Sequence, residues 1–248
     1  MTDNAAPRNR GKPGFTSAVR EVVLIVIGVL IALSLEGLWQ DRTERIAERN
    51  LLLGLTNEFV DNSRALRRTR GGHRRIVASA EEFIVQVEAA PEGQGLLVPD
   101  SLIGNIARTP RYRPDMNTLE AALSSGQITL IRSAEVQRAL ASWRGRLIEA
   151  QQEEQAGADL VYGQIFPHLG AVTSVGPALS WLASDLRRLG QGLPSRPWPS
   201  TTTRIVASRG LTNLLWVRYR LSSAAVNELE ILQQRLDEVL VLLEAELR

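Results

Sequence analysis

The chain has 248 residues, of which 44% are hydrophobic and 23% are charged, so it has enough apolar residues for one globular core. It contains no cysteine, which excludes disulfides, thiol nucleophiles and cysteine-based metal sites. The formal net charge is only +2, and from Asp41 onward 25 arginines are balanced by 24 acidic residues. This near neutrality argues against nucleic acid as a partner.

The N-terminal part combines a basic tail with a strongly apolar run. Residues 1–19 are rich in polar residues, Pro and Gly and are predicted to be disordered. Eleven of the fourteen residues from Val22 to Leu35 are Val, Ile or Leu, and none is charged. Fourteen helical residues cover about 21 Å of a hydrocarbon core of about 30 Å, but Arg20 and Trp39 extend the run to a full span. We therefore predict a transmembrane helix over residues 20–39.

Two other interpretations of this run are open. A buried core helix or strand would also be apolar, because periodicity does not identify a run rich in β-branched residues. A cleavable signal peptide also has a basic segment before its apolar stretch, and Ala32-Leu33-Ser34 has the spacing of a cleavage site. Since this triplet lies inside the apolar run, we favour an uncleaved signal anchor. The N-terminal side carries four basic residues, counting Arg20 at the start of the span, and three arginines follow closely after the span. This small bias and the short, acid-poor tail place the N-terminus inside and the C-terminal domain outside.

Beyond the span, the apolar stripe that includes Leu55 and Phe59 predicts that the same helix continues to about Arg70. Gly71-Gly72 is expected to break this helix, because glycine is a poor helix former. A second helix is then predicted over residues 73–89.

Shorter elements are predicted in the middle of the chain. Asp100 is placed to cap a short helix over residues 101–107. Asn117 and Glu120 have the spacing of a capping box, which predicts a helix with Asn117 as its cap. The segment 127–131 is expected to be extended.

Longer helices follow. Ser133 is expected to cap a helix from residue 134 to about Phe166, where Pro167 stops it. A helix near 177–189 and a proline-rich loop at 192–199 come next.

The last element has the strongest periodicity. Its apolar residues are spaced alternately by four and three positions, as in a heptad repeat: Ala225, Leu229, Leu232, Leu236, Val239 and Leu243. A helix over 211–247, about 55 Å long, is predicted, and additional apolar residues widen its face enough for a bundle. The predicted fold class is all-α, with an N-terminal transmembrane helix that continues into a bundle of long antiparallel helices with short helical insertions, the bundle domain being 40–248.

Two stretches carry a resemblance to a known family. The first is Glu21, the IGVLIAL segment Ile27–Leu33 and Trp39; the second is Leu119–Gly126 with Leu130-Ile131 and Val136–Leu140. In these stretches the chain resembles a family of uncharacterised bacterial single-span membrane proteins, over roughly the first 160 residues. Such proteins often carry a side-chain amide near the end of the span, where this chain has Ser34 and Glu36. The resemblance implies membrane attachment and a helical domain, and it brings no assigned reaction. Together with the charge bias, it leads us to expect a single-pass protein of a bacterial inner membrane, with the helical domain in the periplasm.

One face of the predicted span is a candidate helix contact. Glu21, Gly28, Ala32, Glu36 and Trp39 lie within about 80° of arc on a helical wheel. Gly28 and Ala32 form a small-xxx-small pair, which allows two helices to approach closely. The hypothesis is a contact with a second copy or another membrane protein. Alternatively, both carboxylates lie at the membrane interfaces and contact water.

A second candidate is a cluster of six arginines within twelve residues, with no acidic residue between Asp61 and Glu81: Arg64, Arg67, Arg68, Arg70, Arg74 and Arg75. Such a patch can bind phosphate, acidic lipid headgroups or an acidic partner. It contains no aromatic residue on which a base could stack, so nucleic acid is not expected. The favoured alternative is a solvated helix face whose charges are met by acids such as Glu149, Glu153 and Glu154 of another helix.

No catalytic, cofactor-binding or metal-binding residue is predicted. His73 and His168 are the only histidines, and neither has a second ligand at metal-site spacing. The run Glu153-Glu154 with Asp159 is interpreted as part of a wet helix face. We expect a membrane-anchored interaction or scaffold protein rather than an enzyme, with the lipid bilayer and a second copy or a membrane protein as partners. The alternative is a ligand-sensing bundle that signals through a membrane partner.

Overall fold

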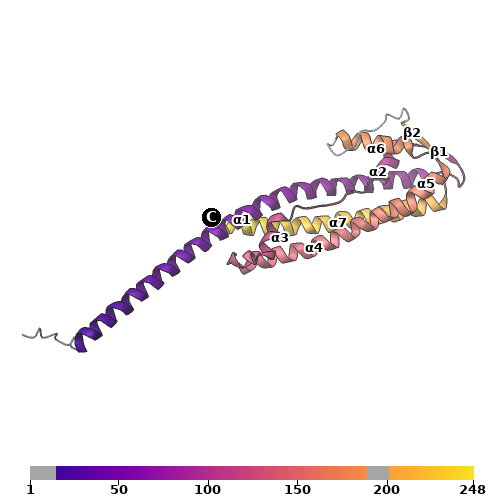
Figure 1. The fold of residues 1–248 in the computed structure, drawn as a ribbon. Coiled ribbons are helices and arrows are strands. Elements are labelled where there is room, and N and C mark those ends of the chain that lie inside the picture. The colour runs from indigo at the N-terminus through magenta and orange to yellow at the C-terminus, as the bar shows by residue number, and fades with distance from the viewer. Residues whose placement is uncertain (1–14, 189–200) are drawn as a thin grey trace, which may run out of the picture. The chain divides into compact units, whose positions relative to one another are not determined.

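A computed structural model describes residues 15–188 and 201–248, without the side chains of residues 15–19, 21 and 22. It confirms the all-α fold class. The helices are α1 (Phe15–Glu88), α2 (Asp100–Ile106), α3 (Asn117–Ser124), η1 (Gln127–Leu130), α4 (Ala134–Leu160), η2 (Val161–Ile165), α5 (Phe166–Val172), α6 (Gly176–Arg188) and α7 (Arg209–Glu246). In the described part, the single sheet pairs β1 (Gly95–Pro99) with β2 (Thr202–Val206) (Figure 1).

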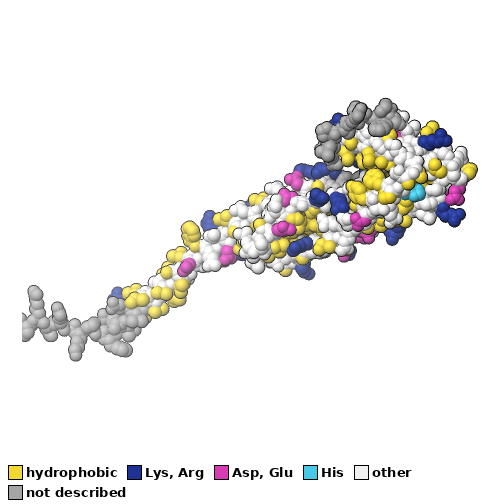
Figure 2. Space-filling model, turned by 45° about the vertical axis from the view of Figure 1, so that its right-hand side comes forward, with side chains coloured by type: hydrophobic (Ala, Val, Ile, Leu, Met, Phe, Trp, Pro, Cys, Tyr) yellow, Lys and Arg dark blue, Asp and Glu magenta, His cyan; other side chains and the backbone are white. Residues whose placement is uncertain are grey.

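The chain divides into two compact units between Asn50 and Leu51. In the first unit, α1 begins at Phe15, inside the tail that was predicted to be disordered, because no glycine or proline interrupts the chain between Gly14 and Gly28. Among the described residues, α1 is the helix long and apolar enough to cross a membrane, and the apolar window within it is unburied. Hydrophobic side chains cover this part of α1 (Figure 2). Residues 40–50, predicted as part of the bundle domain, belong to this unit.

Within the second unit, α1 continues to Glu88 without the predicted break at Gly71-Gly72. Gly72 is buried, and a Cβ added there would lie 3.1 Å from the Cβ of Pro110. The small residue therefore allows another segment to lie close against α1. This packing outweighs the cost of about 1 kcal/mol that each glycine adds to a helix.

Helices α1, α4 and α7 form a three-helix bundle (Figure 1). Their contacts give the directions of the helices. Phe59 contacts Trp143 and His73 contacts Glu154, so residue numbers rise together along α1 and α4, and these two helices are parallel. Ser63 contacts Gln233 and Glu88 contacts Trp216, so α7 is antiparallel to α1. The predicted antiparallel arrangement therefore holds for α7, which is antiparallel to both α1 and α4, but not for α1 and α4, which are parallel to each other.

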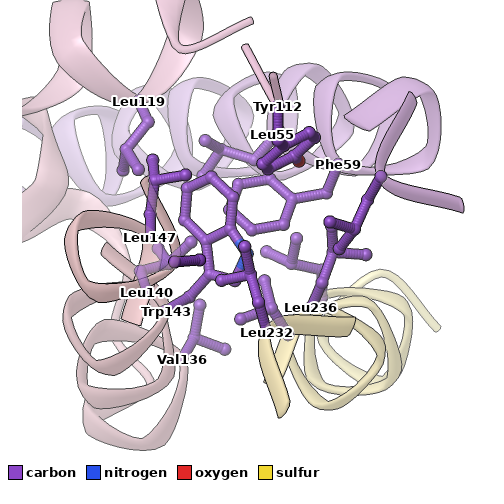
Figure 3. Packing of buried hydrophobic residues seen from close by; sticks show 14 of the residues in the cluster. Leu55, Phe59, Tyr112, Leu119, Val136, Leu140, Trp143, Leu147, Leu232 and Leu236 are labelled. Carbon is purple, nitrogen blue, oxygen red and sulfur yellow. The ribbon is translucent and has the colours of Figure 1, made fainter. Parts of the chain in front are cut away.

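The bundle encloses two clusters of buried apolar residues. In the first, Trp143 lies against Phe59, with ring centroids 4.8 Å apart, and Leu232 and Leu236 of α7 close the other side (Figure 3). The second cluster includes Phe83 of α1 and residues of α2, η2, α5, β2 and α7. The alternating spacing predicted for α7 is confirmed, since all six of the residues on which it was based are buried.

The fourth helix departs from its predicted end. Ser133 caps α4 as predicted, accepting the N–H of Val136. The helix then passes through a π-helical turn, Val161–Ile165, into α5, so Pro167 does not stop it. Pro167 lies in the first turn of α5, directly after the π-helical turn, where the regular α-helical hydrogen-bond pattern is interrupted. The helix expected near 177–189 is confirmed as α6, and the predicted loop at 192–199 lies outside the described residues.

Three local predictions are wrong. Asp100 is the first residue of α2 and does not cap it; its Oδ1 accepts a bond from Thr203 of β2 instead. Asn117 is likewise the first residue of α3 rather than its cap. Segment 127–131 is not extended, because Gln127–Leu130 form the turn η1. In the first two cases tertiary partners replace the local cap that the sequence offers.

Candidate functional site

The bundle contains a layer of buried polar side chains, which we call the central polar layer and which consists of His73, Tyr112, Glu154, Arg218 and Ser222. On each long helix, the layer residues lie between the parts that build the two apolar clusters. The flanking cluster residues are Leu66 and Ala80 on α1, Ala150 and Leu160 on α4, and Leu215 and Leu229 on α7. Buried polar groups are costly unless they are hydrogen-bonded, so this layer is the candidate functional site of the bundle.

His73 and Glu154 face each other across the seam between α1 and α4. Their side chains are 3% and 2% exposed, and the Nε2 of His73 lies 3.6 Å from the Oε1 of Glu154. The other carboxylate oxygen, Oε2, accepts the backbone N–H of Tyr112 at 2.8 Å. In the described part of the chain, three atoms of the pair form no hydrogen bond: the two ring nitrogens of His73 and Oε1 of Glu154. The pair therefore places three unpaired polar atoms inside the bundle.

Arg218 of α7 is 1% exposed and donates to three backbone carbonyls. Its Nε binds the carbonyl of Ile106 at 3.1 Å, its Nη1 binds that of Gly157 at 3.0 Å, and its Nη2 binds that of Arg108. A Cβ added at Gly157 would lie 2.8 Å from Nη1, so glycine makes room for this contact. Burial lowers the pKa of Arg218 to about 10, which keeps the side chain charged at neutral pH.

Tyr112 belongs to a non-helical connection, residues 107–116, that returns from α2 to α3 along the bundle. Its phenol donates to the carbonyl of Asn62 at 3.3 Å. Burial first, and then the charge of Glu154, raise the pKa of Tyr112 well above its ordinary value. The phenol is therefore neutral.

The backbone of this connection is not paired with a strand, so its N–H and carbonyl groups need other partners. Side chains of the long helices provide them. The amide of Asn62 donates to the carbonyl of Asp115 at 2.6 Å and accepts the N–H of Asp115 at 2.8 Å. Gln151 donates to the carbonyl of Tyr112. At the end of the connection, the carboxylate of Glu58 accepts the N–H groups of Thr118 and Leu119 and so caps α3.

Most of the predicted arginine patch is paired with acids or hydroxyls. Arg64 binds Asp61 at 2.7 Å, and Arg70 and Arg74 lie 3.8 and 3.5 Å from the carboxylate of Glu230 on α7. Acids of another helix therefore do meet some of these charges, but the helix is α7 rather than α4. On the visible face of the bundle, basic and acidic side chains are interspersed (Figure 2).

The other three arginines of the patch have no acidic partner in the described part of the chain. Arg67 donates to the hydroxyl of Ser63, and Arg68 and Arg75 are exposed. Glu149 pairs with Arg146 on its own helix. The assignment of Glu154 to a wet face is wrong, because Glu154 lies in the central polar layer.

The predicted contact face of the span is open within one chain. Among the described residues, nothing lies within 4 Å of a Cβ added at Gly28, and Ala32, Glu36 and Trp39 are exposed. The side chain of Glu21 lies outside the described residues. The face is thus free to contact another molecule.

Of the two histidines, His168 is half-buried, with its Nε2 at 3.5 Å from the hydroxyl of Ser208. In residues 15–188 and 201–248, no group of three or more potential ligands is placed to hold a metal ion. The residues brought together in the layer are a histidine–carboxylate pair, a neutral phenol, the hydroxyl of Ser222, which forms no hydrogen bond in the described residues, and a cation held by carbonyls.

Sequence reasoning did not find this layer, although the sequence contained a signal for it. Glu154 occupies a position in the stripe of α4, seven residues after Leu147, and Arg218 occupies one in the stripe of α7, seven residues before Ala225. A charged residue at a core position of a heptad pattern predicts a buried polar group. His73 follows the buried Leu66 by seven residues and has the same signal.

Comparisons with known proteins add no assignment. No protein-family model matches the chain, and no curated protein and no solved structure matches it. The resemblance to bacterial single-span membrane proteins therefore stays a prediction.

Proposed function

We propose that the protein is a membrane-anchored helical interaction or scaffold protein. The observation that carries this proposal is that one helix, α1, contains both an exposed apolar segment of membrane-spanning length and residues of the bundle core. Leu24, Ile25 and Leu30 are 60%, 61% and 58% exposed, which is costly in water and favourable in lipid. The bundle is then held at a membrane surface.

The proposed location is a bacterial inner membrane, crossed once, with the N-terminus in the cytoplasm and the bundle in the periplasm. The excess of basic residues before the span supports this orientation. Fusions of a periplasm-dependent reporter after Arg49 and after Arg248 test it. Activity of both fusions supports the proposal, and activity of a cytoplasm-dependent reporter at both places contradicts it.

The proposed partner is a second copy of the chain, which contacts the face of Gly28, Ala32 and Glu36. The open space at Gly28 supports this, because backbones can approach closely where a side chain is absent. Cross-linking in native membranes is expected to give a discrete oligomer. Gly28→Leu should reduce the cross-linked product severalfold, whereas Val23→Leu, on the opposite face of the helix, should leave it unchanged. Equal cross-linking of both variants, or a purely monomeric wild type, contradicts the proposal.

A further inference from the structure

The geometry of His73 and Glu154 leaves the folded protein with an electrostatic problem. Both side chains are almost fully buried, and together they present three polar atoms with no hydrogen bond in the described part of the chain. A buried carboxylate with one unpaired oxygen is costly, and so is an imidazole with two unpaired nitrogens. A proton added to His73 would make Nε2, which lies 3.6 Å from Oε1, a charged donor to that carboxylate oxygen and would cancel the buried negative charge, while Nδ1 would stay without a partner.

We infer that His73 and Glu154 form a buried proton-binding pair whose protonation tightens the seam between α1 and α4. With the proton on His73, the imidazolium donates to the carboxylate. The pair is then electrically neutral, whereas the pair without this proton buries one negative charge. This inference stands on the bundle alone and is independent of the proposed membrane function.

The charged groups around the pair do not replace the proton. On α1, Arg70 and Arg74 are directed to Glu230. From the connection, Tyr112 offers only its backbone N–H to Glu154 and a neutral phenol to Asn62. On α7, the guanidinium of Arg218 is held by three carbonyls. No arginine of the described residues forms an ion pair with Glu154, so a protonated His73, 3.6 Å away, is the cation that pairs with it.

The sign of the pH dependence follows from this balance. In the unfolded chain both groups are in water and do not interact. Folding brings them together and favours the state with one bound proton, so the folded protein binds more protons than the unfolded protein in the ordinary titration range of histidine. Stability is accordingly highest on the acid side of that range and falls as the pH rises through it.

Thermal unfolding of the full chain in mild detergent micelles tests the inference. Between pH 8 and pH 5.5, the Tm of the wild type is expected to rise by about 3–6 °C more than that of His73→Gln. His168→Gln is the matched control and should keep the wild-type dependence, because His168 is half-buried and far along the chain from the pair. Equal pH dependence of His73→Gln and the wild type overturns the inference.

A second measurement does not require His73→Gln to fold. The chain has only two histidines, so His168→Gln with isotope-labelled histidine gives a single imidazole signal, that of His73. This signal is expected to change protonation state in the folded protein between pH 5.5 and pH 8. Glu154→Gln, which keeps an oxygen for the N–H of Tyr112, should lower the proton affinity at least tenfold. A signal that stays neutral down to pH 5.5, or that Glu154→Gln leaves unchanged, overturns the inference.

Discussion

Replacing Arg218 with methionine tests whether the central polar layer holds the bundle together. Methionine fills most of the space of the arginine stem but provides no donor, so the carbonyls of Ile106, Arg108 and Gly157 lose their partner. A buried polar group left unpaired costs about 1–3 kcal/mol. Removing a buried charge recovers part of that loss. We therefore expect Arg218→Met to lower the free energy of unfolding by about 3–5 kcal/mol, a large part of the 5–15 kcal/mol typical of a folded domain.

Urea unfolding of the full chain in mild detergent, followed by tryptophan fluorescence, to which the buried Trp143 contributes, measures this loss. Arg220→Met is the matched control, because Arg220 is exposed and lies two residues away on the same helix. Arg218→Lys should be intermediate, since one ammonium group does not reproduce the planar fork of donors. A midpoint for Arg218→Met within 0.5 M of the control, roughly 1 kcal/mol at a typical m-value, would refute this account of the layer.

Three further predictions concern the parts that surround the layer. Above pH 10 the tyrosines of the unfolded chain ionise, whereas the buried Tyr112 of the folded chain stays neutral. The unfolded state therefore loses more protons, and the stability of the fold decreases as the pH rises. Tyr112→Phe should reduce this alkaline decrease in the Tm measured by thermal unfolding. Glu58→Ala removes the acceptor at the start of α3 and should cost about 0.5–2 kcal/mol in urea unfolding, whereas Glu120→Ala, at the exposed position of the expected capping box, should cost little. Gly71→Ala should stabilise α1 by up to about 1 kcal/mol, because no described residue lies within 4 Å of the added Cβ. Gly72→Ala should raise the free energy of unfolding less, because its Cβ would contact the ring of Pro110. Equal gains from the two substitutions would contradict the packing argument.

The long elements could be predicted from the sequence because their signals are periodic. The stripe that contains Leu229, Leu232 and Leu236 places one face of α7 in the core, and the structure buries all three. The apolar run from Val22 to Leu35 likewise identified a helix of membrane-spanning length. Such signals are properties of one segment and need no knowledge of its neighbours.

Features that depend on neighbours were not predictable in this way. Asn117 and Glu120 have the residue types of a local cap, yet the cap of α3 is a carboxylate more than fifty residues earlier, Glu58. Gly72 weakens a helix in isolation, but in the bundle it makes room for Pro110. In both cases a contact between distant segments outweighs a local preference of about 1 kcal/mol.

The polar layer also resolves an ambiguity that the heptad pattern leaves open. A helix with apolar residues at heptad spacing packs almost equally well after sliding by seven residues, because every core position again meets an apolar side chain. In α7 such a slide would replace Arg218 by Leu211 or Ala225, both of which are apolar and buried. The carbonyls that Arg218 binds would then have no donor, and its charge would lie in an apolar layer. Arg218 thus costs free energy as a buried charge, and in return it makes one register of α7 much more stable than its nearest alternatives.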